Sequence, residues 1–362
     1  MKILCFHPAL APYRVDFFNL LAERAELRVL FLQKNLMNQK FDQASLRARL
    51  RCRYGELSKG FDIKNRCFRF GIRKAIKEER PEVVLAYEAS PVTLILILYK
   101  KLFFRSLSIW TFMDDSPAQI RTRKGLRRVI RDWVLRNVDK VIVPSQQAAD
   151  AYQLTTNDYP LSTKRVAVVP IIHDANSMRR NASEVYSLGK AWRQENCPES
   201  WERMIVFVGR LAEVKNLPWL IDRMAELPET IGLVMVGDGP LESELKTRVQ
   251  KMNLKDRVVF TGRKEGNGVY AIMAASDALV LVSTSEPFGA VVAEGLGWGT
   301  PCIVSDNCGA ATLIENGVNG WVFKYGDKEG FLGAMRDLPP RSGRSILNVE
   351  LVSFIDSMIG VA

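Results

Sequence analysis

Two carboxylates and a tight turn lie in residues 285–294, where their spacing suits binding of a phosphate and a sugar hydroxyl. Glu286 and Glu294 stand eight positions apart, and Pro287-Phe288-Gly289 follows the first of them. Proline does not continue a helix but fits the turn that opens one, so we expect a helix to begin near Phe288 or Gly289. Its free N–H groups and positive dipole end would face a phosphate beside Glu286. Glu294, about a turn and a half into the helix, would reach a sugar hydroxyl.

The neighbouring sequence places this segment at the edge of a sheet. Residues 277–282 form an apolar run that predicts a buried strand directly before the turn. Open α/β sheets bind ligands where a strand ends, a tight turn follows and a helix begins. The sequence therefore predicts a ligand site at the C-terminal end of this strand.

The two glutamates and the Pro-Phe-Gly between them resemble the E-x7-E motif of family 4 retaining glycosyltransferases, which have the GT-B fold. Four further motifs, in matching order and spacing, carry the resemblance over about residues 205–326, whereas the first 200 residues match only loosely. They are Val208-Gly209-Arg210-Leu211 with Lys215-Asn216, Val236-Gly237-Asp238-Gly239-Pro240, Phe260-Thr261-Gly262, and Gly299-Thr300-Pro301 through Ala310.

The resemblance implies that a nucleotide-sugar donor binds in the second half of the chain without a metal ion. Arg210 and Lys215 would hold its diphosphate, since cations stabilise the charge that grows on a leaving phosphate. Glu294 would accept hydrogen bonds from the ribose, and Glu286 would contact the sugar or lie beside the phosphate. The other residues expected around the donor are Gly209, Gly237, Gly262, Arg263, Phe288, Gly289, Ala290 and Val291.

The donor would be a UDP-sugar or a GDP-sugar, and no cofactor is expected besides this co-substrate. Base recognition is expected from backbone groups near Gly262 and Arg263, so the side chains leave the base open. Retention of configuration without an enzymic nucleophile implies front-face attack guided by the leaving phosphate, which is the mechanism proposed for the family.

Four residues of the first half are candidates for the acceptor side of the reaction. Tyr13 and Arg14 lie in a segment that resembles a loop of one family branch, although Arg14 is equally consistent with a surface charge. Asp114 and Asp115 follow a predicted strand, at a place where many family members have a histidine. They would contact the acceptor or the donor sugar, or else cap the next helix. His7 and His173 are given no catalytic role.

The fold class is predicted from length and from alternating strands and helices. A chain of 362 residues suggests two domains, and strands alternating with helices predict doubly wound parallel sheets. The resemblance implies the GT-B arrangement, two Rossmann-like α/β domains facing a cleft. We expect an acceptor-binding domain over 1–170, a linker with a connecting helix over 171–203, a donor-binding domain over 204–340, and a last helix in 341–362 that returns to the first domain.

Cysteine usage and charge restrict the compartment and the partners. Six cysteines without a C-x-x-C pair and two histidines favour reduced cytosolic thiols and no structural zinc. Residues 1–170 hold 31 Lys and Arg against 16 Asp and Glu (net +15), and residues 171–362 hold 20 against 24 (net −4). A basic first half favours a membrane surface or a phosphorylated acceptor. Nucleic acid is not expected, because no helix-turn-helix or RNA-stacking motif occurs.

Residues 121–136 carry seven cations and one acid and predict a basic amphipathic helix. Its apolar stripe consists of Leu126, Val129, Ile130, Trp133 and Val134. The ordinary interpretation is a domain helix that buries this stripe; the alternative is a helix that lies on an anionic bilayer. The apolar segment 93–104 is too short to span a membrane. We therefore expect a peripheral protein on the cytoplasmic face of the membrane.

The function expected from these features is a metal-independent retaining glycosyltransferase that acts on a glycan or lipid-linked acceptor in surface-polysaccharide or lipopolysaccharide biosynthesis. Three alternatives remain. A GT-B nucleotide-sugar epimerase would need more acid and base groups than a His-poor chain offers. A non-catalytic nucleotide-sugar-binding subunit would bind the donor without turnover, and an anionic-polymer-binding protein would ignore nucleotides.

Overall fold

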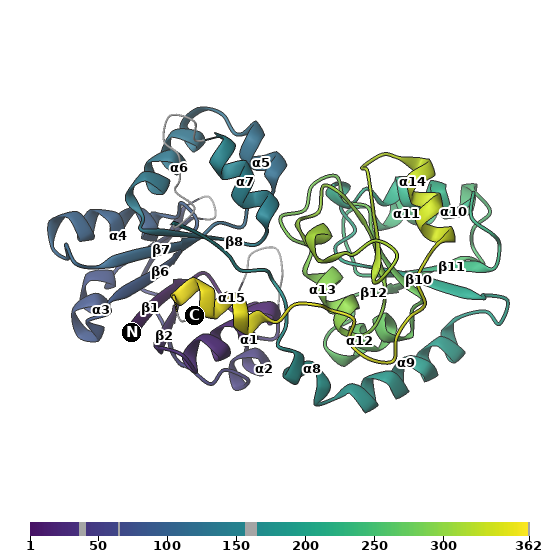
Figure 1. Cartoon of the computed structure of the whole chain (residues 1–362), viewed down its shortest axis with the longest axis horizontal. Helices are drawn as coiled ribbons and strands as arrows, with labels where there is room; N and C mark the ends of the chain where they lie inside the picture. The colour runs from purple at the N-terminus through teal and green to yellow at the C-terminus, as the bar shows by residue number, and fades with distance from the viewer. Residues whose placement is uncertain (36–40, 64–65, 156–164, 361–362) are drawn as a thin grey trace. The chain divides into compact units, whose positions relative to one another are not determined.

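The computed structural model describes residues 1–35, 41–63, 66–155 and 165–360. The chain divides into two compact units (Figure 1). The first contains Met1–Ile171 and Leu351–Ala362, and the second contains Ile172–Glu350. Nearly all of the segment 171–203, which the sequence suggested to be a linker with a connecting helix, is therefore part of the second unit.

A seven-stranded parallel sheet forms the centre of the first unit, in the order β3-β2-β1-β6-β7-β8-β9. The order changes direction between β1 and β6, and both strands are almost completely buried, as strands covered by helices on both faces must be. The strands are β1 (Lys2–His7), β2 (Glu26–Phe31), β3 (Arg53–Glu56), β6 (Val83–Tyr87), β7 (Ser108–Phe112), β8 (Lys140–Val143) and β9 (Val166–Val168). A separate antiparallel hairpin joins β4 (Gly60–Ile63) to β5 (Arg66–Arg69).

Helices connect these strands, and three of them begin with a proline in their first turn, where its missing N–H costs nothing. The helices are α1 (Pro12–Ala22), α2 (Gln43–Ala48), α3 (Ile72–Glu79), α4 (Pro91–Leu102), α5 (Pro117–Thr122), α6 (Gly125–Asn137), α7 (Gln146–Thr155) and α15 (Leu351–Ile359). The last helix, α15, packs against α1, and Asp356 forms an ion pair with Arg24.

The basic segment 121–136 forms the end of α5 and most of α6, but it does not bury its apolar stripe. Leu126 is 74% exposed, Val129 63% and Trp133 40%, and only Val134 is fully buried. The interpretation of a helix that buries the stripe is therefore wrong. Helical periodicity identifies an apolar stripe, but it does not determine whether another element covers it.

A six-stranded parallel sheet forms the centre of the second unit, in the order β12-β11-β10-β13-β14-β15. Its order changes direction between β10 and β13. The strands are β10 (Arg203–Val208), β11 (Ile231–Val236), β12 (Val258–Gly262), β13 (Ala278–Leu281), β14 (Cys302–Ser305) and β15 (Gly320–Phe323).

The helices of the second unit include α9, which lies in the supposed linker and packs closely against α12. Gly189 permits this approach, because a Cβ there would lie 2.4 Å from the carbonyl oxygen of Ala271. The helices are α8 (Ala175–Arg179), α9 (Ala182–Asn196), α10 (Leu217–Met224), α11 (Glu242–Lys251), α12 (Asn267–Ala275), α13 (Ala290–Gly297) and α14 (Lys328–Arg336), with 3-10 turns η2 (Glu213–Lys215) and η3 (Gly309–Leu313).

Candidate functional site

The loops that follow β10 and β13 meet where the strand order of the second sheet changes direction. Lys215, at the end of the 3-10 turn after β10, forms an ion pair with Glu286, which follows β13. Each of the two side chains is 16% exposed. Open parallel sheets bind ligands at such switch points. The pair therefore places a cation and a carboxylate where a ligand can reach both.

Helix α13 directs its N-terminus toward the same loops. It begins at Ala290 after Gly289, whose φ is 91°. A Cβ at position 289 would lie 2.7 Å from the sulfur of Cys308, so the turn requires glycine. Phe288 is 1% exposed and anchors the turn in the core. The first N–H groups of the helix, at Ala290 and Val291, and the positive end of its dipole together suit an anion.

The backbone around Glu286 is hydrogen-bonded to the loop after β14. The amide of Glu286 donates to the carbonyl oxygen of Asn307 at 3.1 Å, and the amide of Gly309 donates back to the carbonyl oxygen of Glu286 at 3.2 Å. The amide of Ala310 donates to the carbonyl oxygen of Phe288 at 2.7 Å. These three hydrogen bonds fix the turn that carries Glu286, and Lys215 contacts its carboxylate.

Glu294 lies in the second turn of α13 and contacts a histidine. Its Oε1 is 3.1 Å from Nε2 of His173, and the two side chains are 14% and 5% exposed. Sequence reasoning gave His173 no role. The two residues are 121 positions apart, and no local pattern links them. The ring of Tyr270 lies 6.4 Å from the His173 ring, in an edge-on arrangement.

Three of the predicted glycines join the ends of neighbouring strands in the second sheet. A Cβ on Gly237 would lie 2.0 Å from the carbonyl oxygen of Gly209, and the amide of Gly237 donates to the carbonyl oxygen of Gly262 at 3.0 Å. Arg210 is exposed beside these turns. Arg263 forms an ion pair with Glu265 of its own loop at 2.6 Å.

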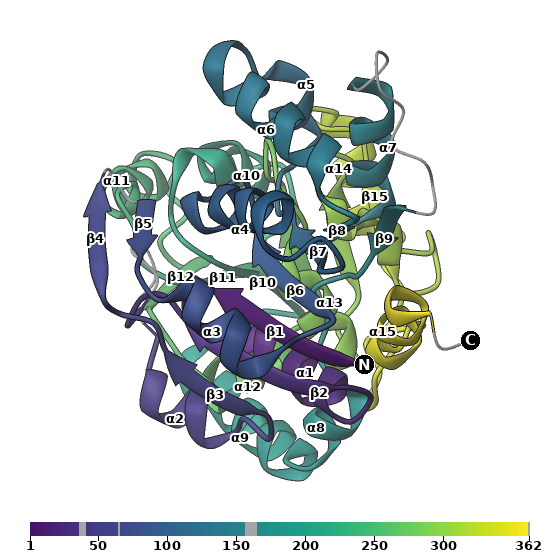
Figure 2. The same cartoon turned by 90° about the vertical axis from the view of Figure 1, so that its left-hand side faces the viewer.

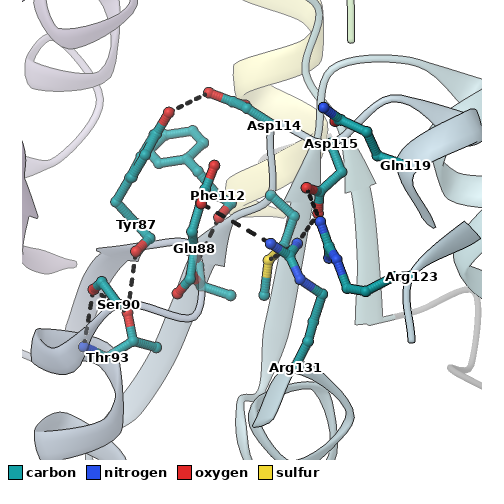
Figure 3. Close-up of polar contacts among 12 residues, drawn as sticks. Tyr87, Glu88, Ser90, Thr93, Phe112, Asp114, Asp115, Gln119, Arg123 and Arg131 are labelled. Carbon is teal, nitrogen blue, oxygen red and sulfur yellow. Dashed lines mark hydrogen bonds and ion pairs between the residues drawn. The ribbon is translucent and has the colours of Figure 1, made fainter. Parts of the chain in front are cut away.

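In the first unit, Arg14 joins α1 to the loop after β7. Its Nη2 lies 3.0 Å from Oδ2 of Asp114, and its guanidinium lies 4.3 Å from the centre of the Phe112 ring. The hydroxyl of Tyr87 donates to the same carboxylate oxygen at 3.0 Å (Figure 3). Tyr13 also flanks the guanidinium, at 5.8 Å. Arg14 is 3% exposed, so its interpretation as a surface charge is wrong.

Asp115 contacts different partners from its neighbour Asp114, as Figure 3 shows. It is 5% exposed and forms ion pairs with Arg123 at 2.6 Å and with Arg131, and it accepts a hydrogen bond from Tyr152. Asp115 therefore connects the loop after β7 to the end of α5, to α6 and to α7. The alternative that an aspartate caps α5 is wrong, because Ser116 is the N-cap.

Two titratable residues at strand ends of the first sheet were missed. His7 ends β1 and donates from Nδ1 to the carbonyl oxygen of Ala9 at 3.0 Å, while its buried Nε2 has no hydrogen-bond partner among the described residues. Burial, together with the charge of Arg14, lowers the pKa of His7 to about 3. Glu88 follows β6 with a φ of 51°, and burial raises the pKa of its carboxyl. Their place at the ends of predicted strands was the available signal.

Within the part of the chain that the structure describes, no group of three or more His, Cys, Asp or Glu side chains is arranged to hold a metal ion. None of the described helices combines the length and the apolar character needed to cross a bilayer. The apolar segment 93–104 falls mostly in α4, which has 12 residues.

Family comparisons match each half of the chain to a glycosyltransferase domain. Residues 11–171 match the glycosyl transferase 4-like domain, and residues 190–339 match the family described as glycosyl transferases group 1. An uncharacterized glycosyltransferase of Methanocaldococcus jannaschii is 35% identical over 125 residues, which are 34% of this chain and 32% of that protein. The lipopolysaccharide core biosynthesis glycosyltransferase LpsD of Rhizobium meliloti is 34% identical over 135 residues, 37% of this chain and 38% of that protein. The chain thus spans only about a third of the length of these curated relatives.

Solved structures share the fold over nearly the whole chain. HepE of Anabaena in complex with UDP and glucose has a TM-score of 0.74 and 17% identity, with 99% of both chains covered. WaaG, a glycosyltransferase involved in lipopolysaccharide biosynthesis, has a TM-score of 0.65 and 17% identity, with 99% of this chain and 94% of that chain covered. The predicted fold class, GT-B with two Rossmann-like α/β domains, is confirmed. A glycosyltransferase domain also matches each half of its sequence, so both halves of the chain are similar to glycosyltransferases of this fold.

Proposed function

We propose that this protein is a retaining, metal-independent glycosyltransferase that moves a sugar from a UDP-sugar or GDP-sugar to a hydroxyl of a glycan or lipid-linked glycan. The setting we propose is biosynthesis of a cell-surface glycan such as lipopolysaccharide. A lipopolysaccharide glycosyltransferase among the relatives supports this setting.

The observation that carries the proposal is the site around Lys215 and Glu286 at the switch point of the second sheet. Departure of a nucleoside diphosphate adds negative charge to its phosphate oxygens, and preorganised cations and N–H groups stabilise such charge. Lys215, the exposed Arg210 and the first amides of α13 supply both kinds of group. Glu294 would accept from two ribose hydroxyls, since one carboxylate binds two donors side by side.

For the acceptor we propose the cluster around Asp114 in the first unit. Arg14 and Tyr87 fix this carboxylate, which keeps 15% of its side-chain surface exposed. A carboxylate held in one orientation can accept a hydrogen bond from an attacking hydroxyl. Asp115 is instead occupied by two arginines and a tyrosine, so we give it a structural role in place of the catalytic one that its sequence position suggested.

The protein would work as a peripheral protein on the cytoplasmic face of the membrane. Leu126, Val129 and Trp133 lie on one side of α6, at spacings of three and four residues, and all are exposed. Exposed cations surround them on the same helix, including Arg127 and Arg128. A basic helix with exposed apolar side chains binds anionic bilayers through both properties.

A thermal-shift panel of UDP, GDP, ADP and the corresponding sugar nucleotides tests the donor site. A ligand that binds only the folded protein raises the melting temperature by mass action. We expect a shift with one nucleotide class, and a smaller shift for Glu294→Ala. Thr247→Ala, an exposed substitution on α11, is the control and should behave like the wild type.

Two further outcomes separate the alternatives. No shift with any nucleotide would refute the donor site and leave an anionic-polymer-binding protein. Binding of a sugar nucleotide without release of nucleoside diphosphate, tested across glycan and lipid-linked acceptors, would instead indicate a non-catalytic subunit.

A further inference from the structure

A basic groove separates α3 from α4 in the first unit. It has a volume of about 580 Å³ and is lined by Gly71, Arg73, Lys74, Lys77, Glu78 and Tyr99. The three cations all lie on exposed positions of α3. Lys74 is 3.6 Å from Glu78, whereas Lys77 forms no ion pair with any described residue. The groove therefore has an excess of positive charge and one aromatic hydroxyl.

The groove is bordered by exposed apolar side chains. Leu98, Leu102 and Phe103, in and directly after α4, are 51%, 60% and 49% exposed. The guanidinium of Arg73 lies 4.1 Å from the centre of the Phe103 ring, so a groove cation touches the apolar border directly. Phe70, next to Gly71, is 61% exposed. Arginine and lysine side chains lay their aliphatic stems on apolar surface and keep their charged ends in the neighbouring polar layer.

The apolar border continues to both sides of α4. This helix packs against β5 and against α6, and Figure 2 shows α3, α4, α6 and the β4–β5 hairpin on the side that faces the viewer. The hairpin adds Phe61 and Ile63, which are 48% and 52% exposed. On α6, Trp133 is exposed and lies 5.5 Å from the ammonium of Lys101. Contiguous exposed apolar patches mark interaction sites, whereas single exposed apolar side chains do not.

We infer that the groove between α3 and α4 binds the phosphate-bearing headgroup of an anionic membrane lipid, while the apolar border enters the acyl layer. Arg73, Lys74 and Lys77 supply charge and N–H donors for phosphate oxygens, and Tyr99 supplies a hydroxyl. An apolar rim around these cations fits an amphiphile better than a fully water-soluble anion. The inference rests on the membrane association proposed above and adds a defined lipid site to it.

Vesicle co-sedimentation of the full chain tests this site. Phosphatidylcholine vesicles that contain phosphatidylglycerol are compared with vesicles that contain oleate instead, adjusted to the same zeta potential. We expect binding to phosphatidylglycerol vesicles to be about tenfold tighter, the effect of one charge-assisted hydrogen bond. Lys74→Gln/Lys77→Gln should abolish the preference. Lys251→Gln/Lys255→Gln, exposed positions of the second unit with the same change in charge, should retain it.

Equal binding to both vesicle types, or equal losses in the two double variants, would overturn the headgroup site and leave general electrostatic attraction. If inorganic phosphate raises the melting temperature through Lys74 and Lys77 but vesicles do not bind, the lipid assignment is wrong. A thermal shift with nucleotides is measured on the same proteins. If nucleotides do not shift the melting temperature of the wild type, the donor site is refuted. A preference for phosphatidylglycerol vesicles would still support the lipid site.

Discussion

The ammonium group of Lys215 and the carboxylate of Glu286 form an ion pair across the switch point of the second sheet, although they are 71 positions apart. The pair exists because the strand order places β10 beside β13, so the loops after these two strands are neighbours. The two charges neutralise each other. A bound diphosphate would compete with Glu286 for the lysine.

Replacing Lys215 with methionine tests this relationship. We expect the affinity for the nucleoside diphosphate to fall about tenfold or more, because a charge-assisted hydrogen bond to phosphate is lost. Isothermal titration with the nucleotide identified by thermal shift measures the change. Lys246→Met is a matched control, since Lys246 also pairs with a glutamate, at 2.6 Å, but on α11. Equal affinities in the two variants would show that Lys215 does not contact the phosphates.

Gly289→Ala should reduce both stability and nucleotide binding. The new Cβ would lie 2.7 Å from the sulfur of Cys308 and 2.9 Å from Cδ2 of Leu281, at a φ of 91°. Backbone strain of this kind costs about 1–3 kcal/mol. The melting temperature and the nucleotide-induced shift report the two effects. Gly268→Ala, with no heavy atom within 4 Å of its Cβ and an ordinary φ, should be neutral or slightly stabilising.

The contact of His173 with Glu294 predicts a change in ribose recognition. If Glu294 binds the ribose hydroxyls, the wild type should bind the ribonucleotide more tightly than its 2′-deoxy form. His173→Ala should reduce this preference by releasing the carboxylate, whereas His173→Gln, which can still donate a hydrogen bond, should retain part of it. Unchanged preference in His173→Ala would show that the histidine does not position Glu294.

Arg14 and Asp114 should be strongly coupled in their effect on stability. Their side chains are 4% and 15% exposed, and removing one partner leaves the other charge buried without compensation. We expect Arg14→Met and Asp114→Asn each to lower the melting temperature. The double variant should lose much less than the sum of the two single losses. Lys100 and Asp139, an exposed pair at 2.6 Å in the same unit, provide the comparison cycle, which should be nearly additive. Additive losses for Arg14 and Asp114 would contradict the coupling.

The sequence predicted what depends on neighbours along the chain. The strand, turn and helix around Glu286 are local, and the sequence predicted all three. Contacts that depend on strand order could not be predicted from the sequence. The contact of Arg14 with Asp114, 100 positions apart, is an example. The exposure of Leu126 was also unpredictable, because periodicity gives the face of a helix but not its neighbour.

The buried His7 predicts an acid-sensitive first unit. Its pKa is about 3 in the folded chain and 6.5 as the ordinary value, so the unfolded chain binds the extra proton between these values. Stability contributed by the neutral ring is therefore present above pH 6.5 and decreases as pH falls toward 3, by about 1.4 kcal/mol per pH unit. His7→Leu removes this titration and leaves all other ionisable groups in place. Between pH 7.5 and 4.5, the wild-type melting temperature should fall more steeply than that of the variant, with the difference appearing below about pH 6.5. Parallel curves would show that His7 is protonated equally in the folded and unfolded chain. The ring would then be accessible to solvent in the folded protein.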